Sequence, residues 1–203
     1  MTGIIDYGLG NLGSIYNMLD VIGEDSIISD NPQKLHECDR LILPGVGSFD
    51  AGMKNLEEKS LINCLKKEVS EGKSILGICL GMQLLGRKSE EGASLGLGFI
   101  PFDTVKFSFD KTLKLKIPHM GWDIVTFTQE NKLLSEIDGR QRYYFVHSYH
   151  AKCDSERNVL MMCDYGYEFA ASVVNENVYG VQFHPEKSHD FGMRLLKNFV
   201  EKC

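Results

Sequence analysis

Residues Ser74–Leu85 read SILGICLGMQLL, and this stretch decides the fold. An apolar run leads into a cysteine between two glycines, and a second apolar segment follows. This order predicts a strand, a sharp turn and a helix, because small flanking residues let the chain turn tightly and expose the residue between them. The turn places Cys79 at a helix N-terminus, where unpaired amides and the helix dipole favour thiolate over thiol. The stretch therefore predicts a nucleophile elbow.

A second motif, His184-Pro185-Glu186, follows another strand-like run, Val178–Phe183. A thiolate needs a base and proton carrier, and His184 is a candidate. Glu186 would hold the imidazole in one tautomer and stabilise its protonated form. Each motif alone also fits a plain interpretation, since free cysteines are often buried and proline often starts a helix. Together they are more specific, and they predict Cys79, His184 and Glu186 as a catalytic triad.

The order of apolar runs predicts the fold class. In the first half, short apolar runs alternate with helix-like segments, which implies a parallel sheet covered by helices on both faces. The second half is richer in strands, so we expect an open, twisted, mostly parallel α/β sheet with additional antiparallel strands. The expected strands are Gly3–Ile5, Ser26–Ile28, Arg40–Leu43, Ser74–Ile78, Val105–Phe109, Lys111–Lys116, Ile124–Phe127, Gln141–Tyr149, Val159–Cys163, Ala170–Val174 and Val178–Phe183. The expected helices are Ser14–Ile22, Phe49–Glu71 with a break near Ser60, and Phe191–Glu201.

The composition is ordinary for a soluble globular protein, with 43% hydrophobic and 25% charged residues. The 203 residues suit a single domain, 1–203, with a full hydrophobic core. A formal net charge of -6 argues against nucleic acid as the main partner. We see no secretory signal and no apolar run near the ~20 residues of a membrane span, so we expect a cytoplasmic chain without membrane contact. Its six cysteines should be reduced there.

At the two motifs the chain resembles a known family. Gly77–Gln83 with His184–Glu186 is similar to the class I, triad-type glutamine amidotransferases, which have a flavodoxin-like fold, hydrolyse the side-chain amide of glutamine and pass the ammonia to a synthase. Three further stretches, Pro44–Gly47, Pro118–Trp122 and Tyr144–Tyr149, resemble the glutaminase subunits of imidazole glycerol phosphate synthases. The resemblance runs from Ile4 to about Val200. We expect no cofactor and no metal.

The loop Pro44–Gly47 follows a buried strand and suggests an oxyanion site. Its glycines allow a backbone amide to point at a developing negative charge, although a plain turn is the simpler interpretation. The resemblance implies that Gly45, Val46 and Gly47 form this site with the amide of Leu80. It also implies that the loop can rest with its amide turned away until a partner binds its substrate.

Four residues are candidates for binding glutamine. Gln83 lies one helical turn after Cys79, on the same face. The resemblance implies that Gln83 contacts the substrate and that Glu91 binds the α-amino group of the substrate. It also implies that Ser148 and Tyr149 form a wall of the pocket. Taken alone, Glu91 belongs to an acidic run that would suit a solvated surface.

A docking face is the remaining implication of the resemblance. Asn11, Trp122, Tyr144 and Lys187 would contact a (β/α)8-barrel cyclase subunit, and exposed aromatic residues do concentrate at such interfaces. One residue departs from the family pattern, which usually continues Gly-Trp with Asn, whereas this chain has Asp123. Asp123 adds a negative charge at the expected interface, or it marks a paralogue that serves a different synthase.

Other motifs suggest other chemistry. Gly8–Gly13 spells Gly-x-Gly-x-x-Gly between a strand and a helix, and Asp30 lies where a dinucleotide site needs an acid. His147, His150 and Cys153 suggest zinc, but residues three apart on one strand point to opposite faces, so we expect no metal site. His119, beside the single tryptophan, is a rival base to His184.

The resemblance thus implies a glutaminase subunit that hydrolyses L-glutamine and feeds ammonia to a barrel cyclase of histidine biosynthesis. The alternative within the class is a paralogous ammonia donor for amidation of a cell-surface sugar. The alternative outside it is a catalytically silent binding module that keeps the fold.

Overall fold

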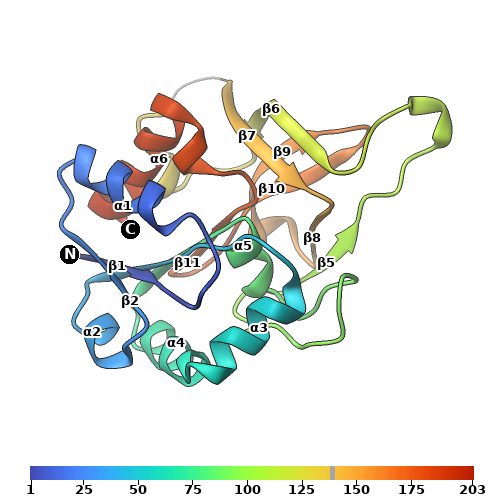
Figure 1. The fold of residues 1–203 in the computed structure, drawn as a ribbon. Coiled ribbons are helices and arrows are strands. Elements are labelled where there is room, and N and C mark those ends of the chain that lie inside the picture. The colour runs from blue at the N-terminus through green and yellow to red at the C-terminus, as the bar shows by residue number, and fades with distance from the viewer. Residues whose placement is uncertain (138–139) are drawn as a thin grey trace.

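A computed structural model describes residues 1–137 and 140–203, whose strands form one sheet in the order β2-β1-β3-β4-β11-β10-β9-β6-β7, with β5 and β8 paired off this path (Figure 1). The strands are β1 Thr2–Ile5, β2 Ser26–Ser29, β3 Arg40–Leu43, β4 Ser74–Ile78, β5 Phe102–Lys106, β6 His119–Phe127, β7 Gln141–His147, β8 Tyr149–Cys153, β9 Val159–Asp164, β10 Glu168–Asn175 and β11 Val178–Val181. The helices are α1 Leu12–Val21, α2 Pro32–His36, α3 Phe49–Glu58, α4 Leu61–Ser70, α5 Leu80–Leu84 and α6 His189–Lys202, with 3-10 turns at Lys111–Leu113, Lys132–Leu134, Glu156–Asn158 and Pro185–Lys187.

The sheet is open and mixed. Strands β1, β2, β3, β4 and β11 pair in parallel. All other pairings, from β10 with β11 to β6 with β7, are antiparallel. The predicted α/β sheet with antiparallel strands in the second half is therefore confirmed, although the antiparallel share is larger than we expected. Short connections favour antiparallel neighbours, whereas each parallel pair needs a crossover.

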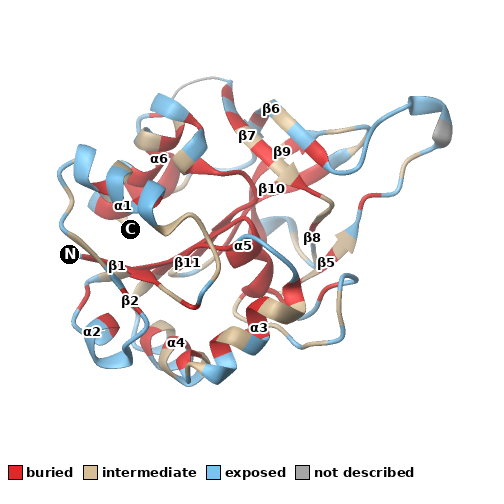
Figure 2. Cartoon of the chain, viewed as in Figure 1, coloured by how far each residue is buried: buried red, intermediate tan, exposed pale blue. Residues whose placement is uncertain are grey.

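Helices cover the parallel strands on both sides, with α1 and α6 on one face and α2, α3 and α4 on the other (Figure 1). Successive residues of β1 show why two layers form: Ile4 packs into one hydrophobic cluster with Leu19 of α1, and Ile5 packs into the other with Leu56 of α3. A strand points its side chains alternately to its two faces, so an all-apolar strand must be covered twice. In Figure 2 the central strands are buried and the outer sides of the helices are exposed.

The break near Ser60 is confirmed, since α3 ends at Glu58 and α4 begins at Leu61. Ser60 adopts a left-handed backbone, with φ 58°, which an α-helix cannot continue through.

Three strands expected between residues 105 and 127 differ from the prediction. The strand expected at Val105–Phe109 spans Phe102–Lys106, and the one expected at Ile124–Phe127 begins at His119. The expected strand Lys111–Lys116 is wrong, because Lys111–Leu113 forms a 3-10 turn. The carboxylate of Asp110 accepts a hydrogen bond from the amide of Thr112 at 2.8 Å, which fixes a turn where alternating side chains suggested a strand.

The topology brings the carboxyl ends of three parallel strands together. The parallel strands β3, β4 and β11 end side by side, at Leu43, Ile78 and Val181. The carboxyl ends of neighbouring parallel strands are the usual place for a binding site in an open α/β sheet. Among the described residues, no helix combines the length and the apolar character that crossing a bilayer requires.

Candidate active site

Cys79 lies in a strained turn between β4 and α5. Its φ of 54° and ψ of -109° are unusual for a residue with a side chain. A Cβ atom on Gly81 would lie 1.8 Å from the carbonyl oxygen of Leu43, and one on Gly77 would lie 2.7 Å from the backbone of Gly81. Only glycines allow β3, β4 and α5 to approach this closely. The predicted elbow geometry is therefore present, with Cys79 at its tip.

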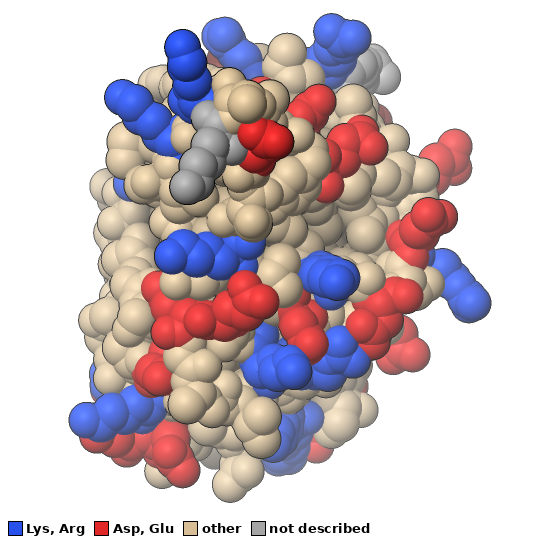
Figure 3. All heavy atoms as spheres, turned by 90° about the vertical axis from the view of Figure 1, so that its right-hand side faces the viewer, with Lys and Arg blue, Asp and Glu red and all other residues tan. Residues whose placement is uncertain are grey.

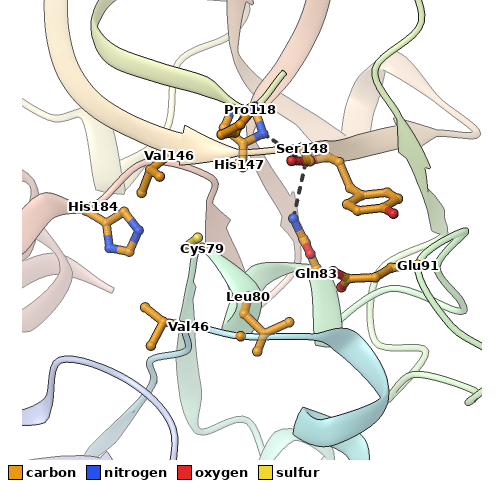
Figure 4. A pocket seen from close by; sticks show the side chains of 12 residues that line it. Val46, Cys79, Leu80, Gln83, Glu91, Pro118, Val146, His147, Ser148 and His184 are labelled. Carbon is orange, nitrogen blue, oxygen red and sulfur yellow. Dashed lines mark hydrogen bonds between the residues drawn. The ribbon is translucent and has the colours of Figure 1, made fainter. Parts of the chain in front are cut away.

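His184 and Glu186 form a buried pair beyond the end of β11. The imidazole Nδ1 lies 2.8 Å from Oε1 of Glu186, and both side chains are almost completely buried. Because the carboxylate accepts at Nδ1, the imidazole presents Nε2 to the cavity. In Figure 4 the ring stands beside Cys79. The pair thus leaves one nitrogen available for proton transfer.

The electrostatics of the pair favour an imidazolium. Burial lowers the pKa of His184, but its interactions with Cys79 and Glu186 outweigh burial and raise that pKa to about 9. Burial raises the pKa of Glu186, and the hydrogen bonds from His184 and Asn11 reverse this and lower it below its ordinary value. A thiolate beside an imidazolium is the state that a cysteine nucleophile requires.

Asn11 also binds the carboxylate of Glu186. Its side-chain amide donates to Oε1 of Glu186 at 3.0 Å, across 175 positions of sequence. Asn11 lies in the loop Gly8–Gly13, which we considered as a dinucleotide site. This loop packs on the end of β3, where a Cβ on Gly10 would lie 3.0 Å from Pro44. The acid that such a site would use, Asp30, is paired with Lys59 at 3.1 Å.

A cavity of about 340 Å³ joins the predicted residues. It is lined by Val46, Gly47, Cys79, Leu80, Gln83, Glu91, Pro118, Val146, His147, Ser148, Tyr149 and His184. Cys79 lies at the centre of this cavity, with His184 on one side and Gln83 and Glu91 on the other (Figure 4). Two of the predicted site residues, Glu186 and Gly45, do not line the cavity. Glu186 lies beside the imidazole of His184. The lining also includes Pro118, Val146 and His147, whose individual roles the sequence did not indicate.

The loop Pro44–Gly47 is tethered next to the elbow. The hydroxyl of Tyr7 donates to the carbonyl of Pro44 at 2.7 Å. A Cβ on Gly45 would lie 2.4 Å from the same hydroxyl oxygen and 2.8 Å from the amide nitrogen of Gly81. Gly47 has φ 118°, which favours glycine. These contacts hold the loop against the turn that carries Cys79.

The candidate substrate residues already have partners in the chain. Gln83 donates its amide to the carbonyl of Tyr149 at 3.2 Å and to Oε1 of Gln182 at 3.1 Å. Glu91 accepts a hydrogen bond from the amide of Phe49, at the start of α3, at 2.8 Å. Gln182 was missed by the sequence analysis, and its amide donates to Sγ of Cys79 at 3.7 Å. The one sequence signal was a polar residue within the apolar run before His184.

The segment that carries His147 and His150 is not the single strand that the sequence predicts. The expected strand Gln141–Tyr149 is broken at Ser148, so His147 ends β7 and His150 belongs to β8. Both rings therefore reach Phe107, with centroids 5.2 and 4.7 Å away, so the prediction that they face opposite ways is wrong. In the part of the chain that the structure describes, the one group spaced for a metal is elsewhere, at His36, Glu68 and Glu71, where the amino group of Lys73 lies 2.6 Å from Glu68.

His119 does not line the cavity. It is buried, with Nδ1 3.1 Å from Nε2 of His147 and Nε2 3.3 Å from the carboxylate of Asp123. Burial lowers the pKa of His119, and Asp123 acts against that effect. Both nitrogens thus face protein groups, and the ring is not placed to exchange a proton with Cys79.

An exposed aromatic group lies beside the cavity on the hairpin β6–β7. Trp122 is 41% exposed and pairs across the hairpin with Tyr144, while His189 stacks on its indole at 5.5 Å. The ammonium of Lys187 lies 5.8 Å from the Tyr144 ring centroid. Met120 and Ile124 are also exposed on β6. The face in Figure 3 intersperses acidic and basic side chains.

The comparisons with known proteins define the family of the chain. The model of the glutamine amidotransferase class-I family matches residues 3–203. A solved structure described as a glutamine amidotransferase superposes with a TM-score of 0.77 at 20% identity, covering 98% of this chain and 97% of that one. The chain belongs to the class-I glutamine amidotransferases.

Its relatives define the family more narrowly. The chain is 53% identical to imidazole glycerol phosphate synthase subunit HisH 2 of Methanococcus maripaludis, over 100% of both chains. It is 47% identical to the subunit HisH 2 of Pseudomonas aeruginosa, over 99% of each chain. Within the class, the chain therefore belongs to the family of HisH subunits.

Proposed function

We propose that this chain hydrolyses L-glutamine to glutamate and supplies the ammonia to a (β/α)8-barrel cyclase, which makes imidazole glycerol phosphate and aminoimidazole carboxamide ribotide in histidine biosynthesis. The observation that carries the proposal is the cavity in which Cys79 and His184 face each other, with Glu186 behind the imidazole. Family membership supports the reaction class, and the names of the relatives support the pathway.

In the proposed first step the Cys79 thiolate attacks the side-chain carbonyl carbon of glutamine. The carbonyl electron pair moves to oxygen, and the resulting oxyanion lies against the loop Gly45–Gly47 and the amide of Leu80. Backbone donors aimed at such an oxygen contribute about 10²–10³ in rate each. Because Tyr7 holds this loop at Pro44, a small rotation within Gly45–Gly47 would align or withdraw its amide.

In the second step the His184 imidazolium gives its Nε2 proton to the amide nitrogen, and ammonia leaves as the thioester forms. The neutral imidazole then takes a proton from water, whose oxygen attacks the thioester carbonyl, and glutamate is released with the thiolate restored. Glu186 stays ionised throughout and holds Nδ1–H. The raised pKa of His184 and the lowered pKa of Glu186 suit these roles.

We assign recognition of glutamine to the side of the cavity that lies across Cys79 from His184. Glu91 offers a carboxylate for the α-ammonium group of glutamine, and the backbone at Ser148 and Tyr149 forms the opposite wall. Both hydrogens of the Gln83 amide are engaged within the chain, which leaves its Oε1 as the atom available to the substrate.

We assign docking of the cyclase to the aromatic group on β6–β7. Trp122 pairs with Tyr144 on the hairpin whose strand β7 also carries Val146 of the cavity wall, and Lys187 lies over the Tyr144 ring. A partner that covers this surface would also cap the cavity and receive ammonia directly. Large exposed aromatic residues beside charged ones are typical of interface hot spots. Asn11 would connect that surface to Glu186. A reduced Cys79 fits a cytoplasmic enzyme.

Reconstitution tests the pathway. Glutamate release is measured for the chain alone, with the barrel cyclase, and with the cyclase plus its histidine-pathway ribonucleotide. We expect a sharp rise only with both, together with imidazole glycerol phosphate as product. Asp123 departs from the family pattern and is the reason to test an alternative function, which is ammonia supply to a sugar-amidating synthase. Amidated sugar from that pairing, with no imidazole product from the cyclase, would select the alternative.

A further inference from the structure

Gln182 is a buried amide beside the nucleophile. It follows β11, has no exposed surface, and lies between the core residues Val181 and Phe183. Its backbone amide continues the sheet by donating to the carbonyl of Ala171 at 2.9 Å. A buried side-chain amide costs free energy unless its polar atoms have partners. The partners of this amide are Gln83 and Cys79.

The direction of these hydrogen bonds is set by a backbone carbonyl. The oxygen of Tyr149 can only accept, and it accepts from Nδ1 of His147 at 2.8 Å and from Nε2 of Gln83 at 3.2 Å. The other hydrogen of the Gln83 amide is donated to Oε1 of Gln182 at 3.1 Å. With Oε1 of Gln182 used as the acceptor, its Nε2–H must point to Sγ of Cys79, 3.7 Å away.

We propose that Gln182 is a further catalytic residue: its amide donates to the sulfur of Cys79 and stabilises the thiolate, and Gln83 is the positioning residue that keeps the amide in its donating orientation. A thiolate is a much better hydrogen-bond acceptor than a thiol, so a fixed donor favours the ionised form. His184 and Gln182 thus act on the same sulfur, the former as a cation and the latter as a neutral donor. The inference rests on the proposed nucleophilic role of Cys79.

The test measures the rate at which iodoacetamide alkylates Cys79 in the isolated chain, from pH 6 to pH 10. Gln182→Met removes the donor and keeps the length of the side chain. We expect alkylation at pH 7 to be at least fivefold slower than in the unchanged protein. The rates should converge at high pH, where the thiolate forms without help. Gln83→Met frees the Gln182 amide to rotate, and we expect a smaller loss, about twofold to threefold, in the same direction.

Asn198→Met is the matched control, because Asn198 is another buried amide that donates to two carbonyls, those of Leu133 and Ser135, outside the cavity. It should lower the stability and leave the alkylation rate unchanged. A rate within twofold of the unchanged protein in Gln182→Met would overturn the inference, as would an equal deficit at every pH or an equal loss in Asn198→Met. The readout uses neither glutamine nor the cyclase. Failure of the proposed function would appear elsewhere, as glutamate release that persists in Cys79→Ala.

Discussion

The parallel and antiparallel regions of the sheet contribute different things to the site. The parallel strands β3, β4 and β11 are short and buried, and the segments that leave them supply the loop Pro44–Gly47, Cys79 and His184. The antiparallel hairpin β6–β7 alternates buried and exposed residues, and it supplies a cavity wall and the exposed aromatic group. Strand ends covered by helices fix reacting atoms, whereas a half-covered hairpin can offer one face to a partner.

The comparison also separates two kinds of constraint. In the parallel region backbones touch, so glycines at fixed positions decide whether the turn can form. In the antiparallel region side chains fill the space, and three histidines and several aromatic rings pack around Phe107. Substitutions should therefore affect chemistry and folding in the first region, and acid stability and docking in the second.

The largest effect is expected at Cys79 in the parallel region. Cys79→Ala removes the nucleophile, so glutamine hydrolysis by the complex should fall at least about 10³-fold. Synthesis driven by added ammonia should continue at the unchanged rate, because the cyclase does not need the thiol. Both rates are measured on the reconstituted complex. Glutamate release near the normal rate would contradict the mechanism.

The next effect concerns the backbone contact in the elbow. Gly81→Ala would place a Cβ 1.8 Å from the Leu43 carbonyl oxygen, so α5 must move away from the end of β3, and we expect a loss of about 3 kcal/mol or more in the free energy of unfolding. Gly13→Ala is the matched control, because a Cβ on Gly13 of α1 meets nothing within 4 Å. It should be neutral or stabilise by up to about 1 kcal/mol. Urea unfolding of both variants checks this, and equal losses would refute the steric argument.

These two predictions concern features of the fold and the site that the sequence alone predicts. The elbow, the residues of the proposed triad and the strands of the first half follow from local patterns, because glycines and apolar runs have short-range meaning. The hydrogen bonds from Asn11 to Glu186 and from Gln182 to Cys79 span 175 and 103 positions, and no local pattern specifies such contacts. The break at Ser148 was also invisible, because residues on both of its sides have the composition of a strand.

A third prediction concerns acid stability in the antiparallel region. Burial lowers the pKa of His147 to about 3, from an ordinary value near 6.5. Between these values the unfolded chain binds a proton that the folded chain does not, so the free energy of unfolding falls as the pH falls. The slope is up to about 1.4 kcal/mol per pH unit for this residue. His147→Gln keeps a polar side chain that does not titrate.

Urea unfolding at pH 7, 6 and 5 should therefore show a shallower dependence on pH for His147→Gln than for the unchanged protein. The comparison uses slopes, so a constant loss of stability caused by the substitution does not matter. Parallel curves for the two proteins would show that His147 is not the residue that limits acid stability.

A smaller effect is expected at the docking face. Trp122→Ala should weaken binding of the cyclase by about tenfold to thirtyfold, since truncation of a central aromatic residue typically costs about 2 kcal/mol. Ile28→Ala is the matched control: Ile28 and Trp122 are each 41% exposed, but Ile28 lies on β2 at the far edge of the sheet. Calorimetry measures both. Equal affinities for the two variants would move the docking surface away from β6–β7.

The smallest effect is expected at Asp123, where the family pattern has Asn. The carboxylate does not point freely outward: one oxygen accepts from the backbone amide of Ile124 at 2.8 Å, and the other lies 3.3 Å from Nε2 of His119. An amide of the same shape could accept from Ile124 and donate to the imidazole. Asp123→Asn should therefore change the affinity for the histidine-pathway cyclase by less than about threefold, in line with partly exposed charges that contribute little. A much larger gain in affinity would mean that the carboxylate opposes this partner, and it would favour the sugar-amidating synthase instead.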